Sequence, residues 1–128
     1  MADLPSNLLY TEEHEYLSAT EEEGVYTVGI TDYAQGELGD IVFVELPGEG
    51  ETLKKGATFG TVEAVKAVSD LYMPVTAEII EANGALNDDP SLVNSDPYGT
   101  GWMIRIRVSD PGELDGLLGP EEYAEHIG

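Results

Sequence analysis

The sequence predicts a small, mainly β domain with a short helix in its N-terminal half and helices near its C-terminus. Short runs of β-branched and aromatic residues recur along the chain, and glycines and prolines separate them. Helix signals occur only at the margins of this pattern, which is typical of a small sandwich or barrel. A chain of 128 residues is long enough to build one hydrophobic core. We therefore expect a single domain over residues 1–128, with a β core at about 9–108 and a C-terminal helical segment at about 109–128.

The first strands follow from their residue types. Residues 9–18 have some extended character, although the stretch 12–15, Glu-Glu-His-Glu, is too polar to belong to a core. Residues 25–30 are rich in β-branched and aromatic side chains and predict a strand. Residues 41–46 predict the clearest strand of the chain, and a Pro-Gly pair ends it.

Three more strands are predicted after this one, at residues 58–63, 75–82 and 102–108. The last of them alternates cleanly between apolar and basic side chains. Its apolar side chains share one face of the strand, and two arginines share the other; the apolar residues are Ile104, Ile106 and Val108. We expect the apolar face to point into the core.

The helices are predicted from their end signals. Thr31 is a good N-cap for a helix that Gly36 and Gly39 limit to about two turns. Near the C-terminus, a capping Ser-Asp pair and an early-turn proline precede a helix over 113–118. A second helix is expected over 120–127.

The charge balance excludes several classes of partner. The chain has 26 acidic and 5 basic residues, which gives a net charge of −21. Nucleic-acid backbones and anionic lipid surfaces would be repelled, so we expect neither nucleic acid nor membrane as a partner. The acidity favours basic protein surfaces, adaptation to a salty cell interior, or simply a soluble surface. Composition does not separate these three.

The lack of cysteines, of long apolar runs and of a signal peptide limits the possible chemistry and cellular location of the protein. The chain has no cysteine, so disulfides, thiolate nucleophiles and cysteine metal sites are excluded. No run approaches the 18 apolar residues of a membrane span, and the N-terminus lacks the basic and apolar stretches of a signal peptide. We expect a cytoplasmic location.

Catalytic motifs are also absent. The only histidines are His14 and His126, and Ser18 stands where a zinc-peptidase helix would place its second histidine. There is no phosphate-binding glycine loop and no nucleophile elbow. The acidic clusters lack the spacing of a calcium loop and are more simply a solvated surface. We therefore expect no catalytic residue and no metal site.

Lys66 is the main candidate for a functional residue in this sequence. It stands among small apolar residues, which suits a hairpin tip that presents one amine. No glycine, asparagine or aspartate lies within 64–67, so turn chemistry alone does not place a hairpin there. The simplest alternative is a solvated surface lysine. The functional alternative is an anchor for a covalent cofactor, which would supply the chemistry that the side chains lack.

Segment 60–70, Gly-Thr-Val-Glu-Ala-Val-Lys-Ala-Val-Ser-Asp, resembles the lipoylation segment of the glycine cleavage system H protein family. Further matches to the family pattern follow in order from about residue 9 to the C-terminal helix: His14-Glu15-Tyr16, 29–35, 38–47, 92–95, 97–98 and 101–103. The sequence departs from the pattern at Tyr16, where a tryptophan is usual, and at Val68, where a smaller residue is common.

The resemblance implies a barrel-sandwich hybrid of the biotinyl/lipoyl type, with lipoate in amide linkage to Lys66 at an exposed hairpin tip. It implies a non-catalytic shuttle of the glycine cleavage system. Such a carrier takes the aminomethyl intermediate from a pyridoxal-phosphate glycine decarboxylase to a folate-dependent aminomethyltransferase. It then brings the dithiol to a dihydrolipoyl dehydrogenase. We expect a monomer that binds these partners and a lipoate-attaching enzyme.

Three acidic residues acquire roles from the resemblance. The loaded arm is expected to fold back into a cleft, where Glu15 and Asp70 receive its cationic amine. Glu63 is expected to help the lipoate-attaching enzyme recognise the hairpin. The alternative for each is an ordinary surface acid.

Two other function classes stay open on the residues alone. A biotin carrier of a carboxylase, or a carrier domain of another acyl-transfer complex, would use the same lysine. Biotin carriers usually have methionines beside the lysine, whereas Val65 and Ala67 stand here. An unmodified acidic interaction domain would not need Lys66 at all.

Overall fold

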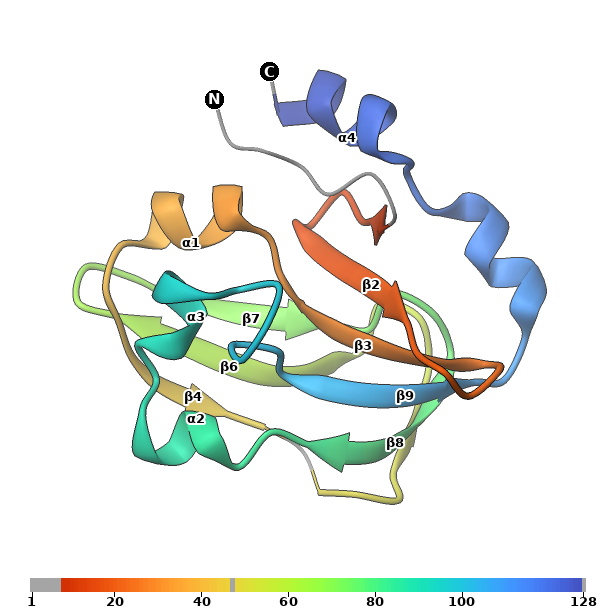
Figure 1. Ribbon diagram of the computed structural model, residues 1–128, viewed down its shortest axis with the longest axis horizontal. Coiled ribbons are helices and arrows are strands. Elements are labelled where there is room, and N and C mark those ends of the chain that lie inside the picture. The colour runs from red at the N-terminus through yellow and green to blue at the C-terminus, as the bar shows by residue number, and fades with distance from the viewer. Residues whose placement is uncertain (1–7, 47, 128) are drawn as a thin grey trace.

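The computed structural model describes residues 8–46 and 48–127. Two antiparallel sheets face each other across the core (Figure 1). The larger sheet has the order β1-β2-β3-β9-β8-β5, and the smaller has the order β4-β6-β7. The larger sheet is built from β1 (Leu9–Tyr10), β2 (Glu15–Ala19), β3 (Val25–Ile30), β9 (Ile104–Val108), β8 (Ala77–Ala82) and β5 (Thr52–Leu53). The predicted mainly β, barrel-sandwich hybrid fold is confirmed, and the sheets do not close into a full barrel.

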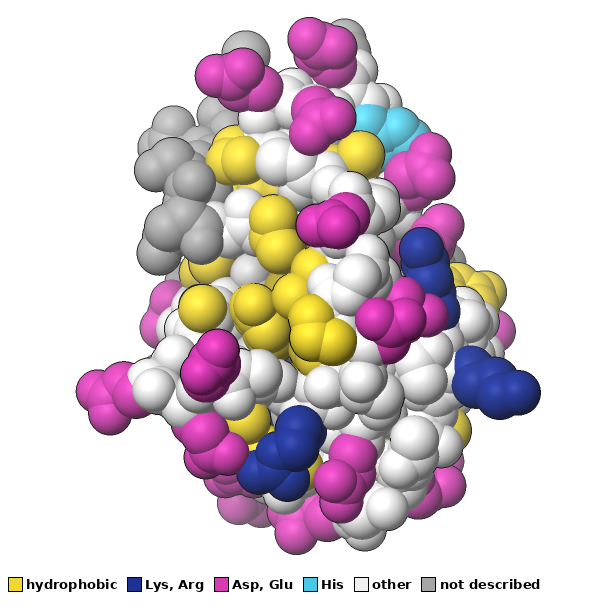
Figure 2. Space-filling view, turned by 90° about the vertical axis from the view of Figure 1, so that its right-hand side faces the viewer, with side chains coloured by type: hydrophobic (Ala, Val, Ile, Leu, Met, Phe, Trp, Pro, Cys, Tyr) yellow, Lys and Arg dark blue, Asp and Glu magenta, His cyan; other side chains and the backbone are white. Residues whose placement is uncertain are grey.

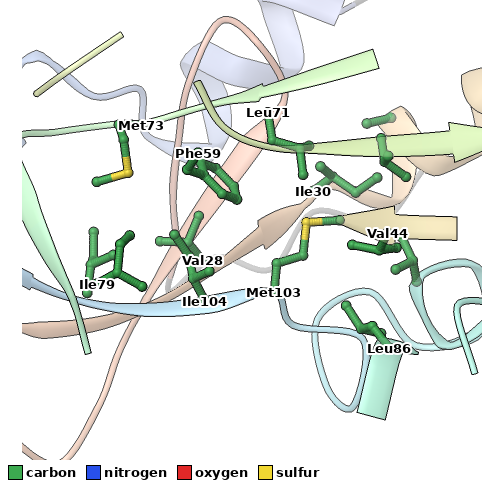
Figure 3. Close-up of a cluster of buried hydrophobic side chains, with 14 of the residues drawn as sticks. Val28, Ile30, Val44, Phe59, Leu71, Met73, Ile79, Leu86, Met103 and Ile104 are labelled. Carbon is green, nitrogen blue, oxygen red and sulfur yellow. The ribbon is translucent and has the colours of Figure 1, made fainter. Parts of the chain in front are cut away.

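The core lies between the two sheets. Strands of both sheets contribute apolar side chains that point toward one another (Figure 3). The central strand β9 shows the predicted alternation, because Ile104 and Ile106 are fully buried while Arg105 and Arg107 face outward. The two arginines form ion pairs with Glu81 on β8 and with Glu22. The sequence interpretation of this strand is confirmed.

The smaller sheet is formed by β4 (Ile41–Glu45), β6 (Thr58–Ala64) and β7 (Val68–Tyr72). β4 pairs with β6, and β6 with β7, through antiparallel registers. The strands β4 and β6 approach each other closely at Gly60, where a side-chain carbon would overlap the carbonyl oxygen of Glu45. Glycine is therefore required at this point of the sheet.

The helix α1 (Asp32–Leu38) follows β3 and matches its prediction. The Thr31 side chain accepts a hydrogen bond from the Ala34 amide, and Gly39 ends the helix with φ of +84°. Gly36 lies within the helix and does not end it. Two further short helices, α2 (Ala85–Asp88) and α3 (Leu92–Ser95), lie between β8 and β9, where no helix was predicted from the sequence.

The C-terminal segment consists of a 3-10 helix, η1 (Pro111–Gly116), and the helix α4 (Pro120–Ile127). The helix predicted over 113–118 is thus a 3-10 helix that begins earlier, and the second helix is confirmed. α4 packs against strand β1 (Figure 1). The rings of Tyr123 on α4 and Tyr10 on β1 stack with their centroids 4.7 Å apart. The Tyr123 hydroxyl lies 2.8 Å from both the Thr31 hydroxyl and His14 Nδ1.

Candidate functional site

Lys66 lies at the tip of the β6–β7 hairpin, in a three-residue connection between Ala64 and Val68. The Ala64 amide donates to the Ala67 carbonyl at 2.7 Å and closes the turn. The Val65 amide donates to the carbonyl of Asp40 at 3.1 Å, which ties the tip to the connection between α1 and β4. Figure 1 shows this hairpin at the left end of the molecule, below α1. The hairpin tip expected for Lys66 is confirmed, although its turn lacks the usual turn residues.

The connection between α1 and β4 is itself held by one side chain from α3. Asn94 accepts a hydrogen bond from the Ile41 amide and donates to the Gly39 carbonyl and to the Gln35 side chain, at 2.8 to 2.9 Å. These bonds fix the backbone that receives the hairpin tip. The sequence interpretation did not find Asn94, because its role depends on contacts with residues more than 50 positions away.

The stem of Lys66 lies over Gly39. The Lys66 Cε stands 3.4 Å from the position that a Cβ on Gly39 would occupy. Because the φ of Gly39 is also positive, a side chain here would be strained and would crowd the lysine. Gly39 therefore leaves the stem of Lys66 room to lie against the backbone.

The Lys66 side chain is exposed. Within residues 8–46 and 48–127 the ion pairs involve only Arg105 and Arg107, so Lys66 forms none although the chain has 26 acids. An exposed amine on a flexible four-carbon stem is open to a modifying enzyme. The geometry thus fits a covalent acyl group on Lys66.

Glu63 and Asp70 lie on the outer face of the smaller sheet. Glu63 is paired with Phe43 on one side and Val68 on the other, and Asp70 is paired with Thr61. Directly paired residues of an antiparallel sheet point to the same face. Both carboxylates are exposed, on the two strands that carry Lys66 at their tip.

Glu15 is buried, with 1% of its surface exposed, so the expectation that residues 12–15 are all too polar for the interior is wrong at this residue. One carboxyl oxygen accepts a hydrogen bond from the Thr11 hydroxyl at 3.2 Å, and the other accepts one from the Tyr72 amide at 2.9 Å. Burial raises the pKa of Glu15 to about 8, although the two hydrogen bonds oppose the shift. Glu15 is therefore mainly protonated at neutral pH.

Strand β7 connects the predicted site residues. Lys66 precedes the strand, Asp70 lies within it, and its last residue, Tyr72, binds Glu15. At about 3.3 Å per residue, Tyr72 lies roughly 20 Å along the chain from Lys66, and Asp70 lies roughly 13 Å from it. The structure thus brings Glu63 and Asp70 to the hairpin of Lys66, and it places Glu15 at the other end of β7.

A cluster of histidine and tyrosine rings next to Glu15 was not found from the sequence. The ring centroid of His14 lies 5.1 Å from that of Tyr33 and 5.7 Å from those of Tyr123 and His126. His14 has a φ of +71°, which is uncommon for a residue with a side chain. Burial, and next the nearby His126, lower the pKa of His14. The rings come from three separate parts of the chain, His14, Tyr33 and the C-terminal helix with Tyr123 and His126, so no local pattern indicates the cluster.

Acidic side chains are spread widely over the surface. Figure 2 shows them around the edges of the end of the molecule opposite the hairpin, with an apolar strip between them. In the described part of the chain no helix is long and apolar enough to cross a membrane. The same residues contain no group of three or more histidines or acids arranged to hold a metal ion.

A two-sheet β fold that presents one exposed lysine at a hairpin tip suits a carrier domain, in which the protein positions a covalent cofactor. A family model of the glycine cleavage H-protein matches residues 8–128. The chain therefore belongs to the glycine cleavage H-protein family. This membership makes it a non-catalytic lipoyl-carrier subunit of the glycine cleavage system.

Individual relatives match over nearly the whole chain. The glycine cleavage system H protein of Bacteroides fragilis is 53% identical over 121 residues, which cover 94% of both chains. That of Rubrobacter xylanophilus is 53% identical over 127 residues, which cover 99% of this chain and 97% of the relative. The crystal structure of a glycine cleavage system H protein from Mycobacterium marinum superposes with a TM-score of 0.88 at 42% identity and covers 98% of this chain and 99% of that chain.

Proposed function

We propose that this chain holds lipoate in amide linkage to Lys66. As a cytoplasmic, single-domain monomer, it carries the arm among a pyridoxal-phosphate glycine decarboxylase, a folate-dependent aminomethyltransferase and a dihydrolipoyl dehydrogenase. The observation that supports this best is the position of Lys66, which is exposed at the tip of a hairpin and free of ion pairs with the described residues. A tether of this kind allows one group to visit several active sites.

Lys66 supplies the nucleophile for attachment. Its Nζ lone pair forms the amide bond to a lipoyl carbonyl that ATP has activated, the amine loses a proton, and AMP leaves. Once attached, the dithiolane would supply the redox-active sulfurs for aminomethyl transfer, and Lys66 would hold it at the end of a mobile arm. The chain itself contributes the fixed hairpin, through the bonds of Val65 and Asn94, and an acidic surface that speeds encounter with basic partner surfaces.

We also propose that Glu15 and Asp70 receive the cationic amine of the loaded arm. Asp70 is exposed on the strand that follows Lys66, so its carboxylate is available to an arm that folds back along β7. Glu15, with a pKa of about 8, is mainly neutral until a cation approaches. A nearby positive charge lowers a carboxyl pKa, so the amine would convert Glu15 to a carboxylate and pair with it.

The lifetime of the loaded arm tests this pair. Glu15→Gln and Asp70→Asn should each shorten the time that the aminomethyl unit stays on the carrier in the absence of the transferase. Isotopically labelled glycine and quenched mass spectrometry would measure it. Unchanged lifetimes in both variants, compared with Glu45→Gln as an exposed control, would contradict the proposed role.

Glu63 is proposed to contribute to recognition by the lipoate-attaching enzyme. It lies on β6 three residues before Lys66, and its carboxylate is exposed on the outer face of the hairpin. A basic side chain of the enzyme could pair with it. Lipoylation of Glu63→Ala at the wild-type rate would contradict this role.

The attachment site is tested by intact mass. After incubation with lipoate, ATP and a lipoate ligase, the wild-type chain should gain one lipoyl group, and Lys66→Arg should gain none. A wild-type chain that is folded but stays unmodified would contradict the proposal and favour an unmodified acidic interaction domain. Modification by a biotin ligase with biotin instead would favour a biotin carrier.

A further inference from the structure

Exposed apolar side chains gather around Lys66. Among residues 8–46 and 48–127, four large hydrophobic side chains are exposed: Val42 (53%), Phe43 (48%), Val65 (76%) and Val68 (66%). Val65 and Val68 belong to the hairpin of Lys66, and Val42 and Phe43 belong to the adjoining strand β4. We call these four residues the tip patch. Scattered exposed hydrophobics are ordinary, but a group around one functional residue indicates a binding surface.

A β-bulge in β4 produces half of the tip patch. Ile41 pairs with Ala64, and Phe43 pairs with Glu63, the neighbour of Ala64 on β6. Val42 therefore has no partner of its own on β6 and is the extra residue of the bulge. Ile41 and Ala64 point into the core, whereas both Val42 and Phe43 are exposed. Bulges commonly redirect side chains near functional sites. The backbone thus presents two neighbouring apolar side chains outward instead of one.

The surroundings of the tip patch are acidic. Phe43, Glu63 and Val68 form one row across the three strands of the outer face. The next row has Glu45 and Asp70 on either side of Thr61, and both acids are exposed. A surface complementary to this face has an apolar centre and basic groups beside it.

The position of the tip patch favours contact with an enzyme that modifies Lys66 over contact with enzymes that act on the attached arm. An enzyme that acylates Lys66 must reach an amine that a four-carbon stem holds close to the backbone of the tip. It cannot do so without contacting the side chains that flank the tip. An enzyme that acts on the far end of an attached arm works one acyl chain farther away and need not touch them.

We propose that the tip patch is the docking surface for the lipoate-attaching enzyme, which covers it with an apolar surface bordered by basic side chains. This inference rests on the proposed attachment of lipoate to Lys66. It assigns to Val42 and Phe43, neither of which is a chain neighbour of the lysine, a role in selecting Lys66 for modification. A few apolar side chains at the centre of an interface commonly dominate its binding energy.

The test compares single substitutions on one sheet. Phe43→Gln and Val42→Gln remove the apolar character of the patch at exposed positions, so the core is not altered. Thr58→Gln is a matched control, because Thr58 is exposed on β6 at the end of the strand away from the tip. Lipoylation by a lipoate ligase is followed by intact mass at low concentrations of the carrier chain, and thermal unfolding confirms that each variant is folded.

The two patch variants should each lower kcat/KM for lipoylation by about tenfold, while Thr58→Gln stays at the wild-type value. Variants that are lipoylated to completion should then support the glycine decarboxylase exchange reaction at the wild-type rate. Normal lipoylation of both patch variants would overturn the inference, whether or not the exchange reaction slows. A wild-type chain that is not lipoylated would overturn the proposed function as well, so the two failures are distinguishable.

Discussion

Glu15 illustrates at the scale of one residue how the fold changes the chemistry of a side chain. Its carboxyl group is removed from water, and its two oxygens are occupied by Thr11 and by the Tyr72 amide. The hydrogen bonds favour the charged form, but the loss of hydration favours the neutral form more strongly and raises the pKa to about 8. The same residue would be ionised at neutral pH in an unfolded chain.

This shift predicts a pH dependence of stability. The folded-state pKa of Glu15, about 8, lies above the ordinary value of 4.5, so between these values the folded chain binds the extra proton. The contribution of Glu15 is therefore fully present below pH 4.5 and is lost as the pH rises toward 8. Glu15→Gln stays neutral, so its free energy of unfolding relative to wild type should rise by roughly 1–4 kcal/mol between pH 5 and pH 8.

Urea denaturation of both proteins at pH 5, 6.5 and 8 would measure this difference. Glu45→Gln is a suitable control, because Glu45 is exposed and its removal should leave the slope with pH nearly unchanged. Parallel pH profiles for wild type and Glu15→Gln would show that Glu15 does not carry the shifted pKa.

Two glycines show how the same residue type serves different elements. Gly60 lies on β6 against the backbone of β4, and any side chain there would overlap the Glu45 carbonyl. Gly36 lies inside α1, and a Cβ there would have nothing within 4 Å. The sheet needs its glycine for close approach, whereas the helix does not need its glycine for space.

The substitutions Gly60→Ala and Gly36→Ala should therefore have opposite effects. Gly60→Ala should separate β4 from β6 and destabilise the chain by roughly 1–3 kcal/mol. Gly36→Ala should stabilise it by roughly 0.5–1 kcal/mol, because alanine loses less backbone entropy in a helix. Chemical denaturation measures both values, and a Gly60→Ala variant as stable as wild type would contradict the close approach of the two strands.

At the scale of the whole molecule the dominant property is negative charge. The net charge is −21, and among the described residues only Arg105 and Arg107 form ion pairs with acids. Repulsion between acids opposes the folded state, since folding brings them closer together. The same charge favours encounter with basic partner surfaces and disfavours nucleic acid.

Salt should therefore stabilise this protein. Raising the ionic strength from about 0.01 M to about 1 M shortens the Debye length from roughly 30 Å to roughly 3 Å and screens the repulsion. We expect Tm to rise by several degrees in a thermal melt, equally in NaCl and KCl. A constant Tm would contradict the importance of repulsion, and a rise with only one cation would indicate specific binding instead.

The sequence predicted the elements whose signals are local. The strand Val25–Ile30, the alternation of β9 and the cap of α1 at Thr31 were all confirmed, because each depends on residue types a few positions apart. The helices α2 and α3 were not predicted, because each has only four residues and no side-chain cap at its N-terminus. The burial of Glu15 was missed, because polarity alone does not reveal a hydrogen-bond partner such as Tyr72.

The sequence by itself determined most of the longer strands, the excess of acidic residues and the choice of Lys66 as the residue of interest. Only the tertiary structure decided how the turn at Lys66 is closed, that Glu15 is buried at the far end of β7, and that Val42 and Phe43 face outward next to the hairpin. The reason is that strand and helix periods arise from neighbouring residues. A turn without turn residues, a buried acid and a bulge depend on hydrogen bonds and packing with segments that are distant in the chain.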